Sequence, residues 1–395
     1  MVDRSDFYPS SVEETVGQII AQGPTECSVN VVDLDQIVHN YQRWVEGHAG
    51  GFAPYYAPSV NNQPMVLALL AKLGAGFSCA SEEEMCTALS LGVRPDRIRL
   101  VHPVKTVESI VFAQRNGIRR IVCDSAAEIG KVYGLFPEAQ IVLRVRMCRE
   151  QKYGCGPRNV VTDILNHAKR MGVQMAGIYV AIPQANQLPV DALQRGLQEA
   201  KAVYEQAYAM GLRHIDELAL FGVESVAPSV LRDATAALHF PPGFTFIVET
   251  ERQFVGTAVS LVANVQSKRV VRDTEAPELI REIMYFINDG RYGSFEWWRP
   301  VTKEPTVYRG THAATLPAQT WPSSVWGPTC DSADIVFERI QLPELDIGDF
   351  MVFSDVGAYG GTLASQFNGF PLPRTVVCAQ HAATRALLGL QPQCS

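Results

Sequence analysis

The chain has 395 residues, which is more than one ordinary hydrophobic core accommodates and enough for two domains. Hydrophobic residues make up 47% and charged residues 19%, which excludes a disordered chain, and a net charge of −7 argues against a nucleic-acid partner. No stretch reaches the roughly 18 apolar residues of a membrane span, and the N-terminus lacks the apolar segment of a secretory signal. The nine cysteines form no CxxC pair, so we expect reduced thiols, no metal site and a cytoplasmic protein without a membrane partner.

Eight short apolar runs follow one another along the chain, and amphipathic stretches separate them. The runs cover residues 53–59, 75–80, 98–104, 119–124, 140–147, 176–182, 217–222 and 244–250. Alternating strands and helices are typical of parallel βα units, and eight such units predict a closed barrel. Ser81 with Glu84 three residues later is a capping box, which predicts a helix start after the second strand. A doubly wound open sheet is the alternative, but no GxGxxG follows the first strand.

After about residue 255 the pattern changes to strands that Pro- and Gly-rich turns separate, without helices between them. These predicted strands cover residues 258–271, 282–289, 349–357 and 374–380. The early run 27–34 precedes the first helix of the barrel, and we expect it to join the second domain. The predicted fold is therefore α/β, a (β/α)8 TIM-type barrel plus a C-terminal all-β domain. The expected parts are an N-terminal segment 1–35 that joins the β domain, a barrel 36–255 and a β domain 256–395.

Polar residues stand at the C-terminal ends of the predicted barrel strands, where the chemistry of such barrels is placed. In chain order these ends carry Ser59, Ser78 with Glu84 beyond it, His102, Asp124, Arg144, Ala181, Gly222 and Glu249. Each polar group taken alone is explained by an ordinary barrel rim, but together they favour one pocket. His102 is a candidate general base, with a rim histidine bonded to a neighbour as the alternative.

The second domain carries denser motifs in its turns. "NDGRYGSF" places Asp289 before a Gly-rich turn, "WGPTCD" sets Cys330 beside Asp331, and "GAYGG" places Tyr359 in a Gly-rich loop. Tight turns explain the glycines, whereas a Cys-Asp pair in a loop is less easily explained by packing. In "FEWWRP", Trp297 and its neighbour could enclose a cation by cation–π contact or could pack together.

These motifs, together with "FNGF", resemble those of the eukaryotic ornithine decarboxylase and antizyme inhibitor family over residues 27 to 380. The resemblance implies a fold-type III pyridoxal-phosphate protein with an alanine-racemase-like barrel and a β domain. Residues around the cofactor are matched by Glu84, Arg144, Glu249 and Arg252. Residues around the substrate and the rim are matched by Asp289, Cys330, Asp331 and Tyr359. The resemblance also implies a homodimer with shared sites, in which the Cys-Asp loop enters the partner's pocket and the two aspartates hold a diamine's distal ammonium.

Five positions depart from the pattern of that family. Ser59 in "YYAPSVN" stands where the cofactor lysine is expected in a motif like "FYAVKCN", and Ser78 replaces an aspartate. Ala181 replaces the histidine that stacks on the cofactor ring, and only Gly222 survives from the phosphate loop. Glu251 occupies a glycine position where a phosphate would lie, and its charge would repel that phosphate. We therefore expect that pyridoxal phosphate is not bound and that the protein has no cofactor.

Three interpretations follow, and the first is favoured. It is a pyridoxal-phosphate-independent enzyme that performs acid/base condensation, cyclisation or isomerisation on a cationic amine, imine or iminium, as in alkaloid-type secondary metabolism. Its predicted catalytic residues are Glu249, Asp289, Cys330, Asp331, Tyr359 and His102. Its predicted substrate-binding residues are Glu84, Arg144, Arg252, Ser59 and Trp297.

The alternative is a catalytically dead regulatory pseudoenzyme, either an antizyme-inhibitor-like decoy or a partner of an active decarboxylase. Residues 102–133 match the region that binds antizyme in the family, with Lys131 at a basic position but Val111 where another lysine is expected. An antizyme-like partner is thus a less favoured expectation. The third interpretation is a decarboxylase with a displaced lysine, Lys105 or Lys72, which the altered phosphate loop disfavours.

Overall fold

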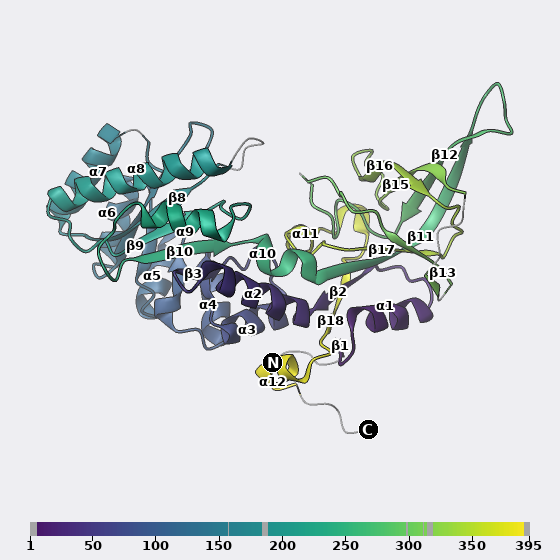
Figure 1. The fold of residues 1–395 in the computed structure, drawn as a ribbon, viewed down its shortest axis with the longest axis horizontal. Coiled ribbons are helices and arrows are strands. Elements are labelled where there is room, and N and C mark those ends of the chain that lie inside the picture. Colours follow the sequence, from purple (N-terminus) through teal and green to yellow (C-terminus); the bar gives the residue numbers. More distant parts are fainter. Residues whose placement is uncertain are drawn as a thin grey trace. The chain divides into compact units, whose positions relative to one another are not determined.

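The computed structural model describes residues 6–156, 158–183, 189–297, 299–310, 312–313 and 319–390. Contacts divide the chain into two compact units (Figure 1). The first, called the barrel unit here, comprises Tyr41–Pro58 and Leu70–Glu251. The second, called the β unit, comprises Met1–Asn40, Ser59–Leu69 and Arg252–Ser395 as far as these are described. Each unit is described by itself below.

Eight parallel strands close the barrel, in the order β10-β3-β4-β5-β6-β7-β8-β9. They are β3 (Phe52–Tyr56), β4 (Gly76–Cys79), β5 (Ile98–Leu100), β6 (Arg120–Cys123), β7 (Gln140–Val145), β8 (Gln174–Ala181), β9 (Glu217–Phe221) and β10 (Thr245–Thr250). Each predicted run contains or overlaps one of them, and β10 pairs with both β9 and β3 to complete the ring. The prediction of a TIM-type barrel is confirmed, and that of a doubly wound sheet is excluded by the closure.

One barrel helix precedes the first barrel strand and others follow the strands in the chain. They are α2 (Leu34–His48), α3 (Pro64–Leu73), α4 (Glu82–Ser90), α5 (Val107–Arg115), α6 (Ala126–Leu135), α7 (Arg158–Met171), α8 (Pro189–Ala209) and α9 (Pro228–Ala236). Of these, α4, α5 and α6 begin at Ser or Thr residues that cap them. The Ser81 hydroxyl accepts a hydrogen bond from the Glu84 N–H, which confirms the predicted start of α4. The Glu84 carboxylate, however, accepts from Ala80 N–H at 2.6 Å, so the expected reciprocal bond to Ser81 is replaced by one to the preceding residue.

A charged pair is buried among the barrel strands. Arg99 on β5 is 1% exposed and forms an ion pair with Glu217 on β9, and its guanidinium lies 4.9 Å from the centre of the Tyr55 ring. Gly177 on β8 makes room for this pair, because a Cβ there would lie 2.5 Å from Glu217 Cγ. A fully buried charge is costly unless it is paired, so this ion pair must form whenever the barrel folds.

The β unit is built on one long strand, β11 (Val259–Arg272). Its first half pairs with β2 (Val29–Asp33) and β17 (Phe350–Phe353), and its second half pairs with β12 (Ile280–Ile287). The other strands are β1 (Phe7–Tyr8), β13 (Thr306–Arg309), β14 (His312–Ala313), β15 (Trp321–Trp326), β16 (Ile335–Leu342) and β18 (Arg374–Cys378). The helices and short turns are α1 (Val12–Ala21), α10 (Arg252–Val255), α11 (Gly360–Leu363) and α12 (Ala382–Leu387). The prediction of a mostly β second part is confirmed, although β15, β16 and α1 were not expected.

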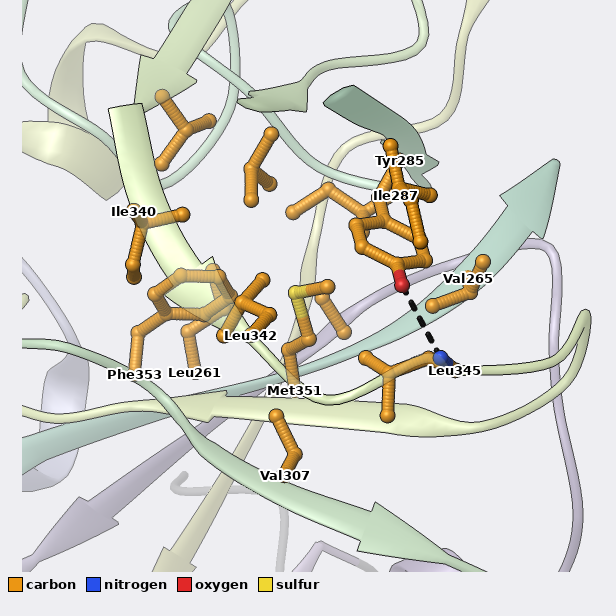
Figure 2. Close-up of a cluster of buried hydrophobic side chains, with 14 of the residues drawn as sticks. Leu261, Val265, Tyr285, Ile287, Val307, Ile340, Leu342, Leu345, Met351 and Phe353 are labelled. Atoms are coloured by element: carbon orange, nitrogen blue, oxygen red, sulfur yellow. Dashed lines mark hydrogen bonds between the residues drawn. The ribbon is translucent and has the colours of Figure 1, made fainter. Parts of the chain in front are cut away.

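A dense apolar cluster fills this β unit (Figure 2). Most of its members come from β11, β12, β16 and β17, among them Leu261, Ile287, Leu342 and Phe353. The fully buried Tyr285 keeps its hydroxyl satisfied, since it accepts from Leu345 N–H at 3.0 Å and donates to the Pro343 carbonyl at 3.1 Å.

The described residues contain neither a membrane-spanning helix nor a disulfide. No helix in that part of the chain is long and apolar enough to cross a membrane. The eight cysteines in it are free, and Cys394 lies outside the described residues, as does Trp298.

Candidate active site

A buried carboxylate with two hydroxyl partners lies toward the C-terminal end of the barrel strands. Glu249 on β10 is 5% exposed; its Oε1 accepts from the Ser78 hydroxyl at 2.6 Å and its Oε2 accepts from the Tyr179 hydroxyl at 2.7 Å. Burial raises the pKa of Glu249, although both hydrogen bonds and the charges of Arg99 and Arg144 oppose that change. A raised pKa favours the protonated carboxyl, which is the form that a general acid requires.

Arg144 on β7 stands beside two tyrosine rings. Its guanidinium carbon lies 5.0 Å from the centre of the Tyr179 ring and 5.6 Å from that of the Tyr153 ring. Burial raises the pKa of the Tyr179 phenol well above its ordinary value, and the charge of Glu249 adds to this change. Tyr179 therefore stays a hydrogen-bond donor to Glu249 at neutral pH. Sequence reasoning missed both tyrosines, yet Tyr179 stands two residues before Ala181 and so on the same face of β8.

His102 contacts one of these tyrosines. Its Nδ1 is hydrogen-bonded to the Val104 carbonyl, and its Nε2 lies 3.4 Å from the Tyr153 hydroxyl. The two rings meet edge to face with their centres 5.6 Å apart. This geometry agrees with the predicted alternative to a general base, which is a histidine at the barrel rim that is hydrogen-bonded to its neighbours. One of these neighbours, however, is the Tyr153 hydroxyl, which can itself donate or accept a proton.

The loop that carries Tyr153 is fastened to three strand ends. Gln151 donates to the Ala181 carbonyl at 2.8 Å and accepts from Met147 N–H at 2.7 Å. Gly154 N–H donates to the Asp124 carboxylate at 2.9 Å, and Cys155 N–H donates to the Arg144 carbonyl at 2.9 Å. The loop is thereby held in one conformation at the end of the barrel.

Lys105 is one of the two lysines of the displaced-lysine interpretation, and its ammonium group is bound by other groups of the barrel unit. Its Nζ donates to the carbonyls of His102 at 3.0 Å and Val122 at 2.6 Å and lies 3.2 Å from the Glu128 carboxylate. Lys131, which matches a basic antizyme-binding position, lies 2.7 Å from the same carboxylate. Both ammonium groups therefore brace the segment that carries His102, and Lys105 is not free to react.

Asp289 in the β unit has a structural set of partners. It is 3% exposed and accepts from the hydroxyls of Ser28 at 2.6 Å and Ser294 at 2.7 Å. Its other oxygen accepts from the N–H groups of Gly290 at 2.7 Å and Ser294 at 2.8 Å. A Cβ on Gly293 would lie 2.1 Å from this carboxylate, which explains a glycine of "NDGRYGSF". The predicted catalytic role of Asp289 gains no support from this enclosure.

The Cys-Asp loop is more accessible and lies among aromatic rings. The Asp331 carboxylate accepts from Ala333 N–H and from the Tyr292 hydroxyl, and these two bonds, the first more than the second, lower the pKa of that carboxyl. The Tyr292 ring stacks on Phe367 with centres 4.3 Å apart, and it meets Trp297 edge to face at 4.3 Å.

The neighbouring Cys330 is exposed, and its N–H donates to Asn368 at 3.1 Å. The thiol therefore stands at the surface of the β unit, where only its backbone is held by the fold.

Ser59, Arg252 and Tyr359 lie in the β unit near one another. Tyr359 N–H donates to the Val60 carbonyl at 2.7 Å, and the Ser59 carbonyl accepts from the Thr362 hydroxyl at 2.8 Å. Arg252 forms a two-bond ion pair with Glu296, and its guanidinium lies 5.0 Å from the centre of the Tyr359 ring. The Ser59 side chain is exposed, so the position of the expected lysine is open to a ligand.

Comparison with known proteins places this chain in a family. A family model described as pyridoxal-dependent decarboxylase, pyridoxal binding domain, matches residues 34–230. Antizyme inhibitor 2 of Xenopus laevis is 31% identical and is aligned over 99% of this chain and 89% of its own length. Ornithine decarboxylase of Schizosaccharomyces pombe is 31% identical over 94% of this chain and 88% of its own. The chain belongs to the ornithine decarboxylase and antizyme inhibitor family.

Solved structures of related decarboxylases share the fold. Arginine decarboxylase of Paramecium bursaria Chlorella virus, solved with agmatine bound, is 25% identical with a TM-score of 0.82 and covers 93% of this chain and all of its own. Lysine decarboxylase of Selenomonas ruminantium is 26% identical with a TM-score of 0.77, covering 93% and 96%. The recognition made from the motifs is thus confirmed.

The family's cofactor can be tested against the residues of this member. A serine hydroxyl at position 59 cannot form a Schiff base, and both oxygens of Glu249 already accept hydrogen bonds from this chain. Gly222 adopts φ +78°, and a Cβ there would lie 2.3 Å from the Ile182 carbonyl, so the turn requires glycine without any phosphate. Glu251, which directly precedes α10, is 9% exposed. These residues do not fit a phosphate ester held by a lysine.

Within the described ranges, no three His, Cys, Asp or Glu side chains are grouped so that they could hold a metal ion.

Proposed function

We propose that this protein is a pyridoxal-phosphate-independent enzyme on an ornithine decarboxylase scaffold. It performs acid/base chemistry on a cationic amine, imine or iminium in cytoplasmic secondary metabolism of the alkaloid type. The observation that carries the proposal is the Glu249 carboxyl, buried and held by two hydroxyls beside Arg144. A satisfied, rigid network around a carboxyl of raised pKa is a feature of acid/base sites.

The chemistry follows from the charges of this network. An ionised Glu249 stabilises the positive charge of an iminium, and a protonated Glu249 delivers a proton to the nitrogen or carbon of an enamine. Burial raises the pKa of this carboxyl, and the charge of Arg144 opposes that change. Condensation, cyclisation and isomerisation of an imine all need these two steps.

Apart from His102, the other predicted site residues are proposed to contact the substrate or to support the site, not to transfer the proton. The accessible Asp331, Cys330, Tyr359 and Trp297 stay candidate substrate-side groups, and Ser59 and Arg252 stay candidate binding groups. Glu84, whose carboxylate caps α4, and Asp289, which is enclosed by four hydrogen bonds, are better explained as supports.

Exposure to pyridoxal phosphate tests the proposal directly. We expect the purified protein to form no stoichiometric aldimine with pyridoxal phosphate and no borohydride-fixed adduct at a single buried lysine. The physical reason is that Ser59 provides no amine and Lys105 is held by carbonyls and by Glu128. Small amines and imines, by contrast, should raise the melting temperature. A stoichiometric adduct mapped to one buried lysine would refute the proposal and restore the decarboxylase interpretation.

A regulatory pseudoenzyme is the alternative, and the alignment with antizyme inhibitor 2 over 99% of the chain is compatible with it. Such a decoy needs its outer surface and tolerates any pocket. Lys131, the basic residue shared with the antizyme-binding region, is 32% exposed and is paired with Glu128. Retention of antizyme by the immobilised protein, with no ligand stabilising it, would support this alternative over the enzyme.

A homodimer is part of the proposal. Trp297 and Phe367 are each 42% exposed, and both contact Tyr292, which is bonded to the Cys-Asp loop. Exposed aromatic groups that gather in this way are typical of subunit interfaces. We expect sedimentation at micromolar concentration to give a dimer, and Trp297→Asp to shift it toward monomer. A purely monomeric wild-type protein would remove the shared site from the proposal.

A further inference from the structure

His102 and Tyr153 form a hydrogen-bonded pair whose proton positions follow from their partners. The Val104 carbonyl can only accept, so the bonded Nδ1 of His102 carries its proton. In a neutral imidazole the other nitrogen then has a free lone pair, and the Tyr153 hydroxyl, 3.4 Å away, donates to it. The phenol is thus aligned to pass its proton to His102 Nε2.

The surroundings of the pair hold it in place and favour charge on the phenol oxygen. The Lys105 ammonium bonds the His102 carbonyl at 3.0 Å, which fixes the histidine end. Lys152 Nζ lies 4.9 Å and the Arg144 guanidinium 5.6 Å from the centre of the Tyr153 ring. Two nearby cations stabilise the negative charge that develops on the oxygen as its proton leaves. Both rings of the pair are half-buried, so a ligand can reach them.

The pair is connected to the buried carboxyl through Arg144. This guanidinium contacts the Tyr153 ring and also the Tyr179 ring, and Tyr179 is bonded to Glu249. The end of the barrel thus has a carboxyl of raised pKa on one side of Arg144 and a phenol that donates to an imidazole on the other. The Glu249 carboxyl and the Tyr153–His102 pair can therefore serve as two different proton donors or acceptors on the two sides of the Arg144 guanidinium, which an acid/base site needs.

We propose that Tyr153 is the proton acceptor of this site and that His102 receives the proton from it. This deepens the proposed function and rests on it. The Tyr153 oxygen takes a proton from the carbon next to an iminium, while the phenol's own proton moves to His102 Nε2. The C–H electron pair stays on the substrate, which becomes a neutral enamine, and the imidazole becomes an imidazolium. Total charge and electrons are conserved, so no oxidant or further reactant is needed.

Hydrogen–deuterium exchange of 1-pyrroline, a small cyclic imine, tests the pair. In D2O we expect the wild-type protein to accelerate exchange at the carbon next to the C=N group, followed by proton NMR. Tyr153→Phe keeps the ring and removes the hydroxyl, and His102→Asn keeps a donor for Val104 and removes the acceptor. Each variant should lose about 100-fold of the acceleration, the scale of general acid–base catalysis. Both should bind 1-pyrroline like the wild type by calorimetry, and the double variant should lose no more than either single one.

Matched controls separate this inference from the proposed function. Tyr208→Phe on α8, where the tyrosine is 48% exposed, should keep the full acceleration. Exchange that Tyr153→Phe retains within threefold would overturn the pair and leave the carboxyl site standing. A wild-type protein that binds the imine without exchanging it would overturn both the pair and the proton-transfer role of Glu249. A protein that neither binds nor exchanges the imine would overturn both proposals. Nitrogen-15 NMR that finds the proton of His102 on Nε2 would overturn the pair without any ligand.

Discussion

Glu249→Gln is expected to abolish most of the imine exchange while leaving the protein folded. The amide keeps the size of the side chain, and the Ser78 and Tyr179 hydroxyls can each donate or accept, so both hydrogen bonds can be remade. What is lost is the negative charge that stabilises an iminium and the proton that a carboxyl delivers. We expect a loss of about 100-fold to 10,000-fold, the range for a general acid or base. The measurement is the exchange rate of 1-pyrroline at saturating concentration.

The stability of the same variant distinguishes a catalytic carboxyl from a structural one. The fold raises the pKa of Glu249, so the folded state binds that proton more tightly than the unfolded chain does. The wild-type free energy of unfolding therefore falls, relative to the variant's, as pH rises from about 4.3, the ordinary value for glutamate, through the raised pKa. The variant should be as stable as the wild type or more stable at neutral pH, measured by urea unfolding.

An exposed carboxylate supplies the control for both measurements. Glu138→Gln changes the same charge on the surface and should alter neither exchange nor the pH dependence of stability. If Glu249→Gln unfolds more easily than the wild type at neutral pH and keeps its exchange rate, the carboxyl is a structural group and the proposed function is wrong.

Arg99→Met is expected to produce the largest loss of stability in the chain. It leaves Glu217, which is 4% exposed, without its main partner, because Arg120 approaches only to 3.7 Å. Removing one partner of a buried ion pair costs about 3–5 kcal/mol, since an uncompensated charge stays in a medium of low polarity. The urea midpoint should fall accordingly at an unchanged slope.

A second variant separates the pair's charge from its packing. Replacing both partners, as Arg99→Met with Glu217→Met, should recover most of the loss because no charge stays buried. Arg94→Met, in an ion pair whose side chains are 72% and 65% exposed, should change the free energy of unfolding by less than about 1 kcal/mol. A double variant that is as unstable as Arg99→Met would show that shape, not charge, is what the barrel needs there.

The barrel could be predicted because each of its strands is an apolar run that a helical pattern follows. Eight such runs with helical stretches between them leave few topologies, since parallel strands need crossovers and crossovers have one hand. The β unit was predicted less completely. The runs 321–326 and 335–342 contain two serines, a glutamate, an arginine and a glutamine, so their alternation is weak, and β16 is stabilised by pairing with β15 rather than by its own pattern.

The residues of the candidate site that stand at strand ends could be named from the sequence, whereas the contacts between their side chains could not. Glu249, Arg144 and His102 were found because each stands at a strand end, which a period of two and the direction of the chain determine. Tyr153 lies in a loop, and the sequence around it contains no motif that indicates a functional residue. Only the folded chain brings it into contact with Arg144 and His102. The carboxylate of Asp289 is enclosed by local hydrogen bonds that its motif does not reveal in the sequence, and its predicted catalytic role stays a prediction.

The sequence by itself determined the family and the barrel, because these depend on residue type and order along the chain. Only the tertiary structure decided which polar groups have partners. It pairs Glu249 with two hydroxyls, fastens Lys105 among carbonyls, encloses Asp289 and brings His102 to Tyr153. Hydrogen bonds and ion pairs act over a few ångströms between residues up to hundreds of positions apart, so their partners exist only once the chain has folded.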